Sequence, residues 1–428
     1  MNIIQIIPGS GGSFYCGNCL RDSKYVDALR NLGHQVVKIP MYLPLFADEH
    51  DITDIPIFYG AISTYLKQVY PVFRKAPKWF DKLLNSKPMM KMAASMAGST
   101  RAKGLEDITI SMLLGEQGEQ KEELDNMVNW IAEHCNPDVI HISNALLLGL
   151  AKRLKEKTGV PIVCSLQDED VWVDAMQPQF QKKIWDLMHE RSEDVDALVA
   201  VSNYFADTME TRMNLNEKKV HTFYLGVDAE DYPFIPVKEK PRNVGYISRM
   251  CHKDGFDIVV DAFIELKKKS GFEDVKLIAT GGLTGDDKKF LKEQKQKIKN
   301  NNLENSFEII EEFEGDARHY FFKKVSMISV PVRVGEAFGM YLLESMASGV
   351  PVVQPELGAF PEIVEISGGG VTYLPNTPEK LSETWAELLN DSEKLEKLSL
   401  TGVKGTKEKF NIHNHAAEII GLYESLKK

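Results

Sequence analysis

Short apolar runs alternate with helical patterns along most of this chain. In the first half, each of the following runs adjoins a segment with apolar residues at helical spacing: Ile3–Ile7, Gln35–Ile39, Val139–Ile142, Pro161–Leu166 and Ala197–Val201. A second series follows: Val244–Ser248, Val275–Ala279, Phe307–Ile310, Val325–Val330 and Val350–Val353. This alternation predicts an α/β fold in which parallel sheets have helices on both faces. A segment rich in prolines and charges, residues 228–241, separates the two series and is typical of an interdomain linker.

Two glutamates lie around a predicted helix start in the second series. The segment runs Glu336-Ala-Phe-Gly-Met-Tyr-Leu-Leu-Glu344, and its apolar spacing predicts a helix that begins near Gly339 and ends at Gly349. The N–H groups and the dipole at a helix start favour phosphate. An ionised carboxylate accepts protons from paired hydroxyls, so the two glutamates could hold a sugar and a ribose. The alternative is that both are solvated surface charges.

The elements around these glutamates favour a ligand site. Val325–Val330 precedes them and residues 350–354 follow, which predicts a right-handed strand, loop, helix, strand crossover. Ligands in such sheets bind beyond the carboxyl ends of the strands, where Glu336 falls. The run as far as Gly358-Ala-Phe-Pro-Glu362 resembles the donor-site signature of the family 4 glycosyltransferases, retaining enzymes of the GT-B fold.

This resemblance implies a particular fold and reaction. GT-B enzymes have two Rossmann-like lobes whose parallel sheets face a central cleft. Here that implies an acceptor-side lobe at residues 1–238, a donor-side lobe at 239–410 and a helix at 411–428 that crosses back to the first lobe. The implied reaction moves a sugar from a UDP- or GDP-sugar to an acceptor with retention, and it requires no cofactor and no metal ion.

Arg249 and Lys253 are candidate catalytic residues in the loop after Val244–Ser248. A guanidinium and an ammonium in a strand-to-helix loop can neutralise a departing diphosphate, although both could be ordinary surface cations. The resemblance places the diphosphate-binding cations here, and it implies that Glu336 grips sugar hydroxyls and Glu344 the ribose. It also implies donor contacts for a set of mostly glycine residues: Gly11, Gly12, Gly281, Phe338, Gly339 and Met340.

The loop after the first strand contains glycines and two cysteines. Gly9-Ser-Gly-Gly12 does not fit the dinucleotide pattern, because Phe14 stands where a third glycine is needed and no acid follows the second strand. Cys16-Gly-Asn-Cys19 follows at a predicted helix start, where the dipole could lower a thiol pKa. A thioredoxin-like redox site and a pair of packed, reduced cysteines are both open interpretations. A zinc site would need two further ligands, and the chain has no second Cys-x-x-Cys.

The loop after Pro161–Leu166 carries candidate acceptor-binding residues. It reads Gln167-Asp-Glu-Asp170, where many relatives have a histidine, so Gln167, Asp168 and Glu169 are the candidates together with Asn144. Asp168 and Asp170 also form an Asp-x-Asp triplet, a metal-nucleotide motif of another glycosyltransferase fold. Helix capping and first-turn acidity are the alternative interpretation of that triplet.

The net charge of −11 argues against general nucleic-acid binding, but one stretch is basic. Between residues 61 and 105, aromatic and apolar side chains interleave with these cations: Lys67, Arg74, Lys75, Lys78, Lys82, Lys87, Lys91, Arg101 and Lys103. The stretch could rest on an anionic membrane or admit an anionic acceptor, or it could be a solvated helical cap.

Composition and cysteine content favour a cytoplasmic enzyme. The chain has 428 residues, of which 43% are hydrophobic, enough for more than one core. It has no recognisable signal peptide, no apolar run of about 18 residues, and five cysteines, which favours reduced thiols. We therefore expect a cytoplasmic glycosyltransferase, with a nucleotide-sugar donor and a glycan, lipid-linked or small-molecule acceptor, that could bind peripherally at the inner face of the membrane. The alternative is a non-catalytic sugar-nucleotide binding protein or a thiol-redox switch that uses Cys16 and Cys19.

Overall fold

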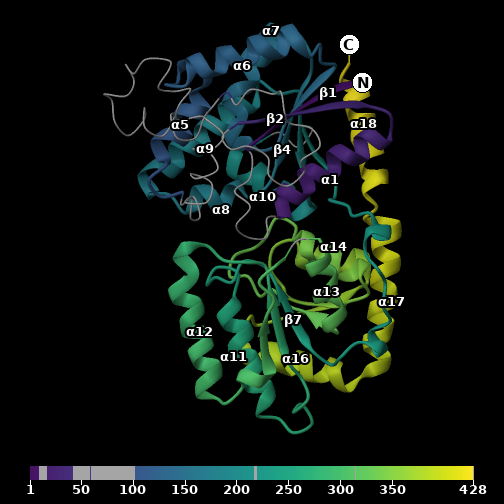
Figure 1. Cartoon of the computed structure of the whole chain (residues 1–428). Coiled ribbons are helices and arrows are strands. Elements are labelled where there is room, and N and C mark those ends of the chain that lie inside the picture. The colour runs from purple at the N-terminus through teal and green to yellow at the C-terminus, as the bar shows by residue number, and fades with distance from the viewer. Residues whose placement is uncertain (9–16, 42–57, 59–101, 216–218, 314, 428) are drawn as a thin grey trace. The chain divides into compact units, whose positions relative to one another are not determined.

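The computed structural model describes residues 1–8, 17–41, 58, 102–215, 219–313 and 315–427. These residues form two compact units, each built on a six-stranded sheet (Figure 1). The first unit contains the N-terminal strand, Asn18–Tyr224 and His415–Lys428, and the second contains Leu225–Asn414. The charged segment 228–241 therefore lies entirely within the second unit.

The first sheet has the order β2-β1-β3-β4-β5-β6, and all neighbouring strands are parallel. Its strands are β1 (Asn2–Ile7), β2 (Gln35–Pro40), β3 (Val139–Ile142), β4 (Ile162–Leu166), β5 (Ala197–Ala200) and β6 (Val220–Thr222). The register aligns Ile3 of β1 with Val36 of β2 and Val139 of β3. The five strands predicted in the first half of the chain are confirmed, and β6 is an additional edge strand.

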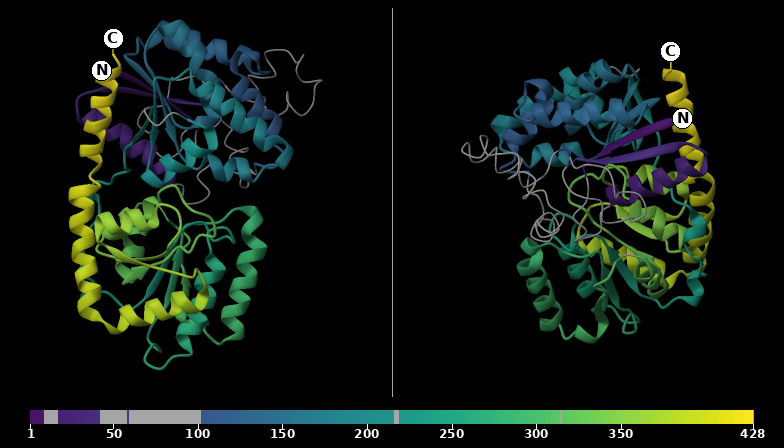
Figure 2. Two further views of the ribbon diagram at one scale, coloured as in Figure 1. Left: turned by 180° about the vertical axis from the view of Figure 1, so that it is seen from behind. Right: turned by 45° about the horizontal axis from the view of Figure 1, so that its top comes forward.

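Helices of the first unit cover both faces of this sheet. They are α1 (Gly17–Asn31), α5 (Glu106–Leu114), α6 (Lys121–His134), α7 (Ala151–Thr158), α8 (Glu169–Asp174), α9 (Pro178–Ser192), α10 (Asn203–Met213) and the C-terminal α18 (Ile412–Leu426). The helices α1 and α18 lie side by side (Figures 1 and 2), and the Tyr25 hydroxyl donates to the carbonyl of His415. The hydroxyl of Tyr423 on α18 also lies 2.5 Å from Nδ1 of His141 on β3. The C-terminal helix is thus attached both to α1 and to the first sheet.

The second sheet has the order β12-β11-β10-β7-β8-β9, again with parallel neighbours. Its strands are β7 (Val244–Ile247), β8 (Leu277–Thr280), β9 (Phe307–Ile309), β10 (Met327–Ile328), β11 (Val352–Pro355) and β12 (Gly370–Tyr373). The chain moves outward from β7 through β8 to β9, then returns to β10 and moves the other way. The strand order therefore reverses between β7 and β10, which is a topological switch point.

Helices of the second unit also lie on both faces of its sheet. They are α11 (Phe256–Lys267), α12 (Lys288–Asn300), α13 (Asp316–Lys324), α14 (Met340–Ala347), α15 (Phe360–Ser367), α16 (Pro378–Asn390) and α17 (Ser392–Lys409). On one face α11 contacts α12 and α16, and on the other α14 and α15 contact α17 (Figure 1). Short 3₁₀ turns complete the two units: η2 (Gly115–Gln117), η3 (Ala145–Leu150), η5 (Ala229–Asp231), η6 (Val237–Glu239), η7 (Gly285–Asp287) and η8 (Glu304–Ser306).

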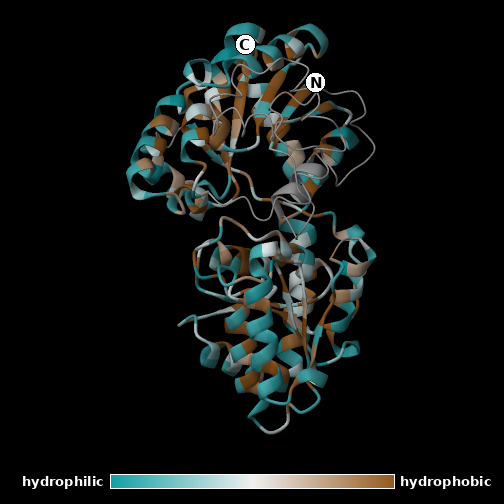
Figure 3. Cartoon of the chain, turned by 60° about the vertical axis from the view of Figure 1, so that its left-hand side comes forward, coloured by the Kyte–Doolittle hydropathy of each residue, from teal (hydrophilic) through white to brown (hydrophobic). Residues whose placement is uncertain are grey.

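The strands form the apolar centre of each unit. Every residue of β3, β4, β7 and β8 is buried, as expected for parallel strands with helices on both faces. Figure 3 shows the strands as mostly hydrophobic and the outer helical surfaces as largely hydrophilic. The predicted α/β fold with parallel sheets is confirmed. Among the described residues, no helix has the combined length and apolar character needed to cross a membrane.

Candidate functional site

Two loops meet where the strand order of the second sheet reverses. Residues 248–255 follow β7 and carry Arg249 and Lys253, and residues 329–339 follow β10 and carry Glu336. Ligands of open α/β sheets bind beyond the carboxyl ends of the strands at such a reversal. The structure therefore brings the three predicted catalytic residues to the loops that flank one switch point.

Direct contacts hold these two loops together. The backbone N–H of Arg333 donates to the carbonyl of Lys253 at 3.1 Å. The Arg333 guanidinium also binds both carboxylate oxygens of Asp257, on the first turn of α11, at 2.9 Å each. A Cβ atom added at Gly255, which has a φ of +74°, would lie 1.9 Å from the carbonyl oxygen of Pro331. Close packing and a bidentate ion pair thus fix Lys253 relative to the loop that carries Glu336.

Glu336 is half-buried and oriented by α14. The Tyr341 hydroxyl donates to Oε2 of Glu336 at 2.6 Å. Burial, together with the charge of Glu336, raises the pKa of Tyr341 well above its usual value, so its hydroxyl stays a donor. The backbone carbonyl of Glu336 accepts from Ala359, and Gly358 approaches so closely that a Cβ atom there would lie 2.4 Å from the Glu336 nitrogen.

Replacing Gly358 with alanine should therefore distort the Glu336 loop. Gly368 is a matched control, because its φ of +63° is close to the +61° of Gly358 while an added Cβ would meet no atom nearer than 3.5 Å. Both alanine variants bear the cost of a left-handed backbone, and only Gly358→Ala adds overpacking of about 1–3 kcal/mol. Urea unfolding of the two variants measures the difference. Equal losses of stability would show that the space at Gly358 does not restrict the loop.

The residues at the start of α14 face the core. Gly339 is the N-cap, as predicted, with a φ of +92° that favours glycine, and Ser348 is the C-cap. The side chains of Phe338 and Met340 are 3% and 4% exposed, and the Phe338 ring meets that of Phe410 edge-on. A ligand at this helix start would therefore contact Phe338 and Met340 through their backbone.

Arg249 joins the loop after β7 to the loop after β8. Its Nε and Nη2 donate to the two oxygens of Asp287 at 2.7 and 3.0 Å, and Nη2 also donates to Thr284. Burial alone would raise the pKa of Asp287, but the bonds from Arg249 and Thr284 outweigh it and hold that pKa below its usual value. Gly281 packs against Ser248 so tightly that an added Cβ would lie 2.3 Å from the Ser248 carbonyl oxygen. The guanidinium thus has a defined orientation.

Lys253 differs from Arg249 in being exposed. Within the part of the chain that the structure describes, its ammonium group has no hydrogen bond or ion pair. A compact charge on a flexible stem is therefore available at the switch point, beside a guanidinium that is held in place.

Glu344 lies inside α14 and has no exposed surface. Its Oε1 accepts from Nη1 of Arg318 at 2.7 Å and from the hydroxyl of Tyr232 at 2.9 Å. Arg318 comes from α13 and Tyr232 from the C-cap of η5. A buried carboxylate requires such partners, because burying an unpaired charge is costly. Sequence reasoning identified neither partner.

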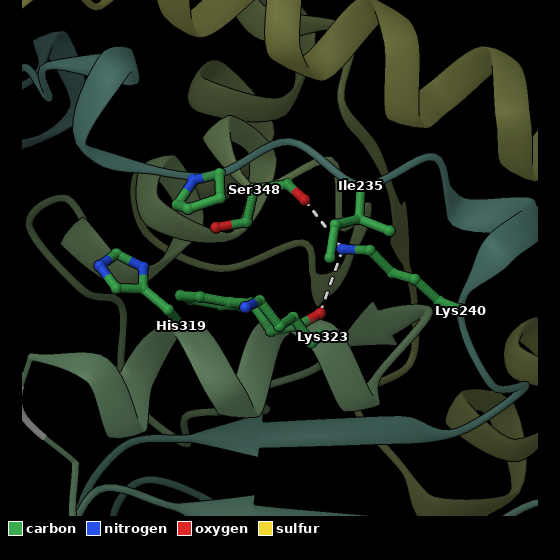
Figure 4. A pocket seen from close by; sticks show the side chains of 7 residues that line it. Ile235, Lys240, His319, Lys323 and Ser348 are labelled. Atoms are coloured by element: carbon green, nitrogen blue, oxygen red, sulfur yellow. Dashed lines mark hydrogen bonds between the residues drawn. The ribbon is translucent and has the colours of Figure 1, made fainter.

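A small hollow lies where residues 233–240 pass the helix α13 (Figure 4). Its interior has no room for a water molecule, whereas typical ligand sites measure roughly 300–1,000 Å³, so it is not a ligand site. In Figure 4 the Lys240 ammonium donates to two carbonyls, those of Ser348 at 2.8 Å and Phe322 at 3.1 Å. These carbonyls belong to the C-terminal ends of α14 and α13, where the helix dipole favours a cation. Lys240 thereby fixes the helices that carry Glu344 and Arg318.

The buried position of Lys240 predicts a pH-dependent contribution to stability. Burial lowers the pKa of Lys240 to about 7, whereas an unfolded lysine titrates near pH 10.4. Between these values the unfolded chain binds the proton and the folded chain does not, so this contribution rises with pH from about 7 to 10 and is lost as pH falls through 7. The melting temperature of the wild type minus that of Lys240→Met should therefore increase from pH 6 to pH 9. A constant difference would contradict this.

The predicted acceptor residues lie together in the first unit, where β3 and β4 are neighbours. The Gln167 amide donates to the carbonyl of Ser143 at 2.7 Å, and Asn144 caps the start of η3. Glu169 accepts from the backbone N–H groups of Ala145 and Gln167 at 2.7 and 2.6 Å. One carboxyl group thus joins the loops that follow the two strands.

Several features of this region are costly for folding. Asp168, the N-cap of α8, has a φ of +56°. Burial raises the pKa of Glu169 to about 8, although its bonds from backbone N–H groups oppose the rise. Within the described residues, the buried Oγ of Ser143 and Oε1 of Gln167 have no hydrogen-bond partner. Strained backbone and unpaired polar atoms gather at functional sites more often than elsewhere.

Several of the predicted site residues lie outside the part of the chain that the structure describes. Gly11, Gly12, Cys16 and residues 61–101 of the basic stretch lie outside the described residues, as does the thiol of Cys19, although Cys19 belongs to α1. The described cysteines Cys135, Cys164 and Cys251 are free thiols. Over the described ranges, no group of three or more His, Cys, Asp or Glu residues is placed to hold a metal ion.

Comparisons with known proteins identify the family. Residues 228–404 match the model of the Glycosyl transferases group 1, and residues 122–231 match that of Glycosyltransferase Family 4. An uncharacterized glycosyltransferase of Methanocaldococcus jannaschii is 27% identical over 300 residues, 69% of this chain and 78% of that protein. The lipopolysaccharide core biosynthesis mannosyltransferase LpsB of Rhizobium meliloti is 30% identical over 187 residues, 43% of this chain and 51% of that protein.

A solved structure confirms the fold. The crystal structure of Anabaena HepE in complex with UDP and glucose superposes with a TM-score of 0.69 at 18% identity, and all of both chains is covered. The two family matches together span residues 122–404, well over half of the chain. The predicted family and the predicted GT-B fold are both confirmed. The chain belongs to the family 4 glycosyltransferases of the GT-B fold.

Proposed function

We propose that this enzyme transfers a sugar from a UDP- or GDP-sugar to an acceptor hydroxyl with retention at the anomeric carbon. The observation that supports the donor class is the meeting of Arg249, Lys253, Glu336 and the start of α14 at the switch point of the second sheet. The HepE structure, which shares this fold, contains UDP and glucose. Retention rests on the resemblance to family 4.

In this proposal Arg249, Lys253 and the helix start hold the diphosphate. As transfer proceeds, the bond between the anomeric carbon and the diphosphate oxygen breaks, a bond to the acceptor oxygen forms, and the proton of the acceptor hydroxyl passes to an oxygen of the departing diphosphate. Negative charge then grows on the diphosphate, where preorganised cations and backbone N–H groups stabilise it most. Asp287 keeps Arg249 oriented, and Lys253 adds a mobile charge. The mechanism uses protein charges for this step, so it needs neither a metal ion nor a cofactor.

The carboxylates have separate roles. Glu336, oriented by Tyr341, accepts hydrogen bonds from hydroxyls of the donor sugar, and Glu344 accepts from the ribose. Gly281 allows the loop after β8 to approach the nucleotide, and Phe338, Gly339 and Met340 contribute backbone groups.

We propose that the first unit forms the acceptor-binding lobe and the second unit the donor lobe, with the end of the chain returning to the first. In this proposal Asn144, Gln167, Asp168 and Glu169 bind the acceptor, and Gly11 and Gly12 contribute to substrate binding. The unpaired polar atoms of Ser143 and Gln167 support a polar acceptor, such as a glycan, a glycolipid or a small molecule. A cytoplasmic location, with peripheral attachment through residues 61–105, fits a lipid-linked acceptor.

Incubation with UDP- and GDP-sugars in the absence of acceptor tests this proposal, because water can replace the acceptor hydroxyl. Proton NMR of the anomeric region should show slow release of the free sugar, with the α-anomer first from an α-linked donor. A β-anomer as first product would exclude retention. Donor binding without any turnover would favour the sugar-nucleotide binding protein instead.

A further inference from the structure

The side chain of Arg318 lies against the carboxylate that is proposed to bind ribose. Its Nη1 is 2.7 Å from Oε1 of Glu344, and its Nε donates to the carbonyl of Phe313 at 3.2 Å. The loop before α13 and a carboxylate of α14 therefore hold the two ends of one guanidinium. Glu344 has no exposed surface, whereas the Arg318 side chain is 12% exposed.

Tyr232, the second donor to Oε1 of Glu344, is held in place by packing. The ring of Tyr232 is buried and meets the His319 ring edge-on at 5.8 Å. Burial, with the nearby charge of Glu344, raises the pKa of Tyr232 well above its usual value, so the hydroxyl remains a donor. Tyr232 can thus stay bonded to Glu344 while the longer, partly exposed Arg318 side chain moves.

In the observed arrangement, no surface of Glu344 is open to a ribose hydroxyl. A ribose hydroxyl must come within about 2.5–3.0 Å of a Glu344 oxygen to form a hydrogen bond. A carboxylate without exposed surface offers no such approach. Among the described residues, Tyr232 and Arg318 donate to Oε1, and of these two Arg318 combines exposed surface with a flexible stem.

We propose that Arg318 is a gate on the nucleotide site: its guanidinium covers Glu344 and must leave that carboxylate before a ribose can bind there. This inference rests on the proposed ribose contact of Glu344. Each binding event then includes the loss of a charged hydrogen bond, so Arg318 lowers the affinity of the enzyme for nucleotides. Arg318 thereby raises the nucleotide concentration at which the site becomes occupied.

Calorimetric titration of the full chain with UDP, and separately with GDP, tests the gate. Arg318→Met should bind the nucleotide about tenfold more tightly than the wild type, the scale of one hydrogen bond to a charged group. Arg318→Gln, which retains a neutral donor, should give a smaller gain. The control is Arg242→Met, because Arg242 pairs at the surface with Asp274 and its loss should leave affinity unchanged.

A double variant distinguishes competition between Arg318 and ribose for Glu344 from a structural effect of losing Arg318. In the Glu344→Gln background, Arg318→Met should no longer tighten binding, since the competing carboxylate is absent. If Arg318→Met does not fold, Arg318→Gln carries the comparison. Unchanged or weaker binding in the folded Arg318 variants, with wild-type binding intact, would overturn the gate and leave the donor site standing. Failure of every variant to bind either nucleotide would overturn both.

Discussion

Glu336→Gln should lower turnover of the donor by about 100-fold or more while nucleoside diphosphate affinity changes only slightly. A neutral amide keeps the size of the side chain but replaces a charged acceptor with a weaker one at the sugar, where charge develops in the transition state. The Tyr341 hydroxyl can still donate to the amide oxygen, so the loop should keep its shape. Initial rates of donor hydrolysis and calorimetry with UDP and GDP measure the two effects.

Glu365→Gln is the control for this substitution, because Glu365 is exposed on α15. It should leave both turnover and affinity unchanged. Glu344→Gln should mainly weaken nucleotide binding through lost ribose contacts. If Glu336→Gln and Glu344→Gln lowered turnover and affinity alike, the proposed division of roles between the two carboxylates would fail.

Arg249→Met and Lys253→Met should each weaken nucleoside diphosphate binding by about 1–3 kcal/mol, the range for hydrogen bonds to charged groups. The structure adds a distinction between them. Arg249 joins two loops through Asp287 and Thr284, so its loss should also lower the melting temperature. Lys253 is exposed, so its loss should lower affinity without a change in stability. Calorimetry and thermal denaturation separate the two cases.

Lys289→Met serves as the matched control, since Lys289 is an exposed lysine on α12 of the same unit. A comparable loss of affinity in that variant would indicate a general effect of charge on the unit. Unchanged affinity in both the Arg249 and Lys253 variants would remove these cations from the donor site.

The sequence was sufficient to predict most strands because parallel strands buried on both faces are continuous apolar runs. Val139–Ile142 was predicted with the bounds that the structure shows. The two strands that were missed are edges of their sheets. β6 has three half-buried residues, and β12 begins with Gly370 and is only half-buried over most of its length. Neither gives a strong apolar signal, so no pattern distinguished them from loops.

The positions of the candidate donor residues could be predicted where a local pattern fixes them. Arg249, Lys253 and Glu336 each follow a strand, and parallel topology alone brings the ends of β7 and β10 together. Asp287, Arg318 and Tyr232 could not be found in this way. Each contacts a residue at least 26 positions away in the chain, and a lone polar residue on a helix gives no sign of its partner.

The contacts of Glu169 are a further case that the local sequence could not predict. Glu169 was predicted to contact a substrate from its place in an acidic loop, but its carboxyl group accepts two backbone N–H groups from different loops. Its full burial follows from three-dimensional packing that the local sequence does not encode. In the structure Glu169 therefore links the loops that follow β3 and β4, and within the described residues Oε1 of Gln167 has no hydrogen-bond partner; acceptor binding by either residue stays a prediction.

A crystal structure of the enzyme with bound UDP tests the central claim most directly. We predict that the diphosphate will lie beyond the carboxyl ends of β7 and β10, against Arg249, Lys253 and the backbone at the start of α14, with the ribose at Glu344 and Arg318 displaced from it. UDP bound elsewhere, with these loops and the Arg318 ion pair unchanged, would contradict the account.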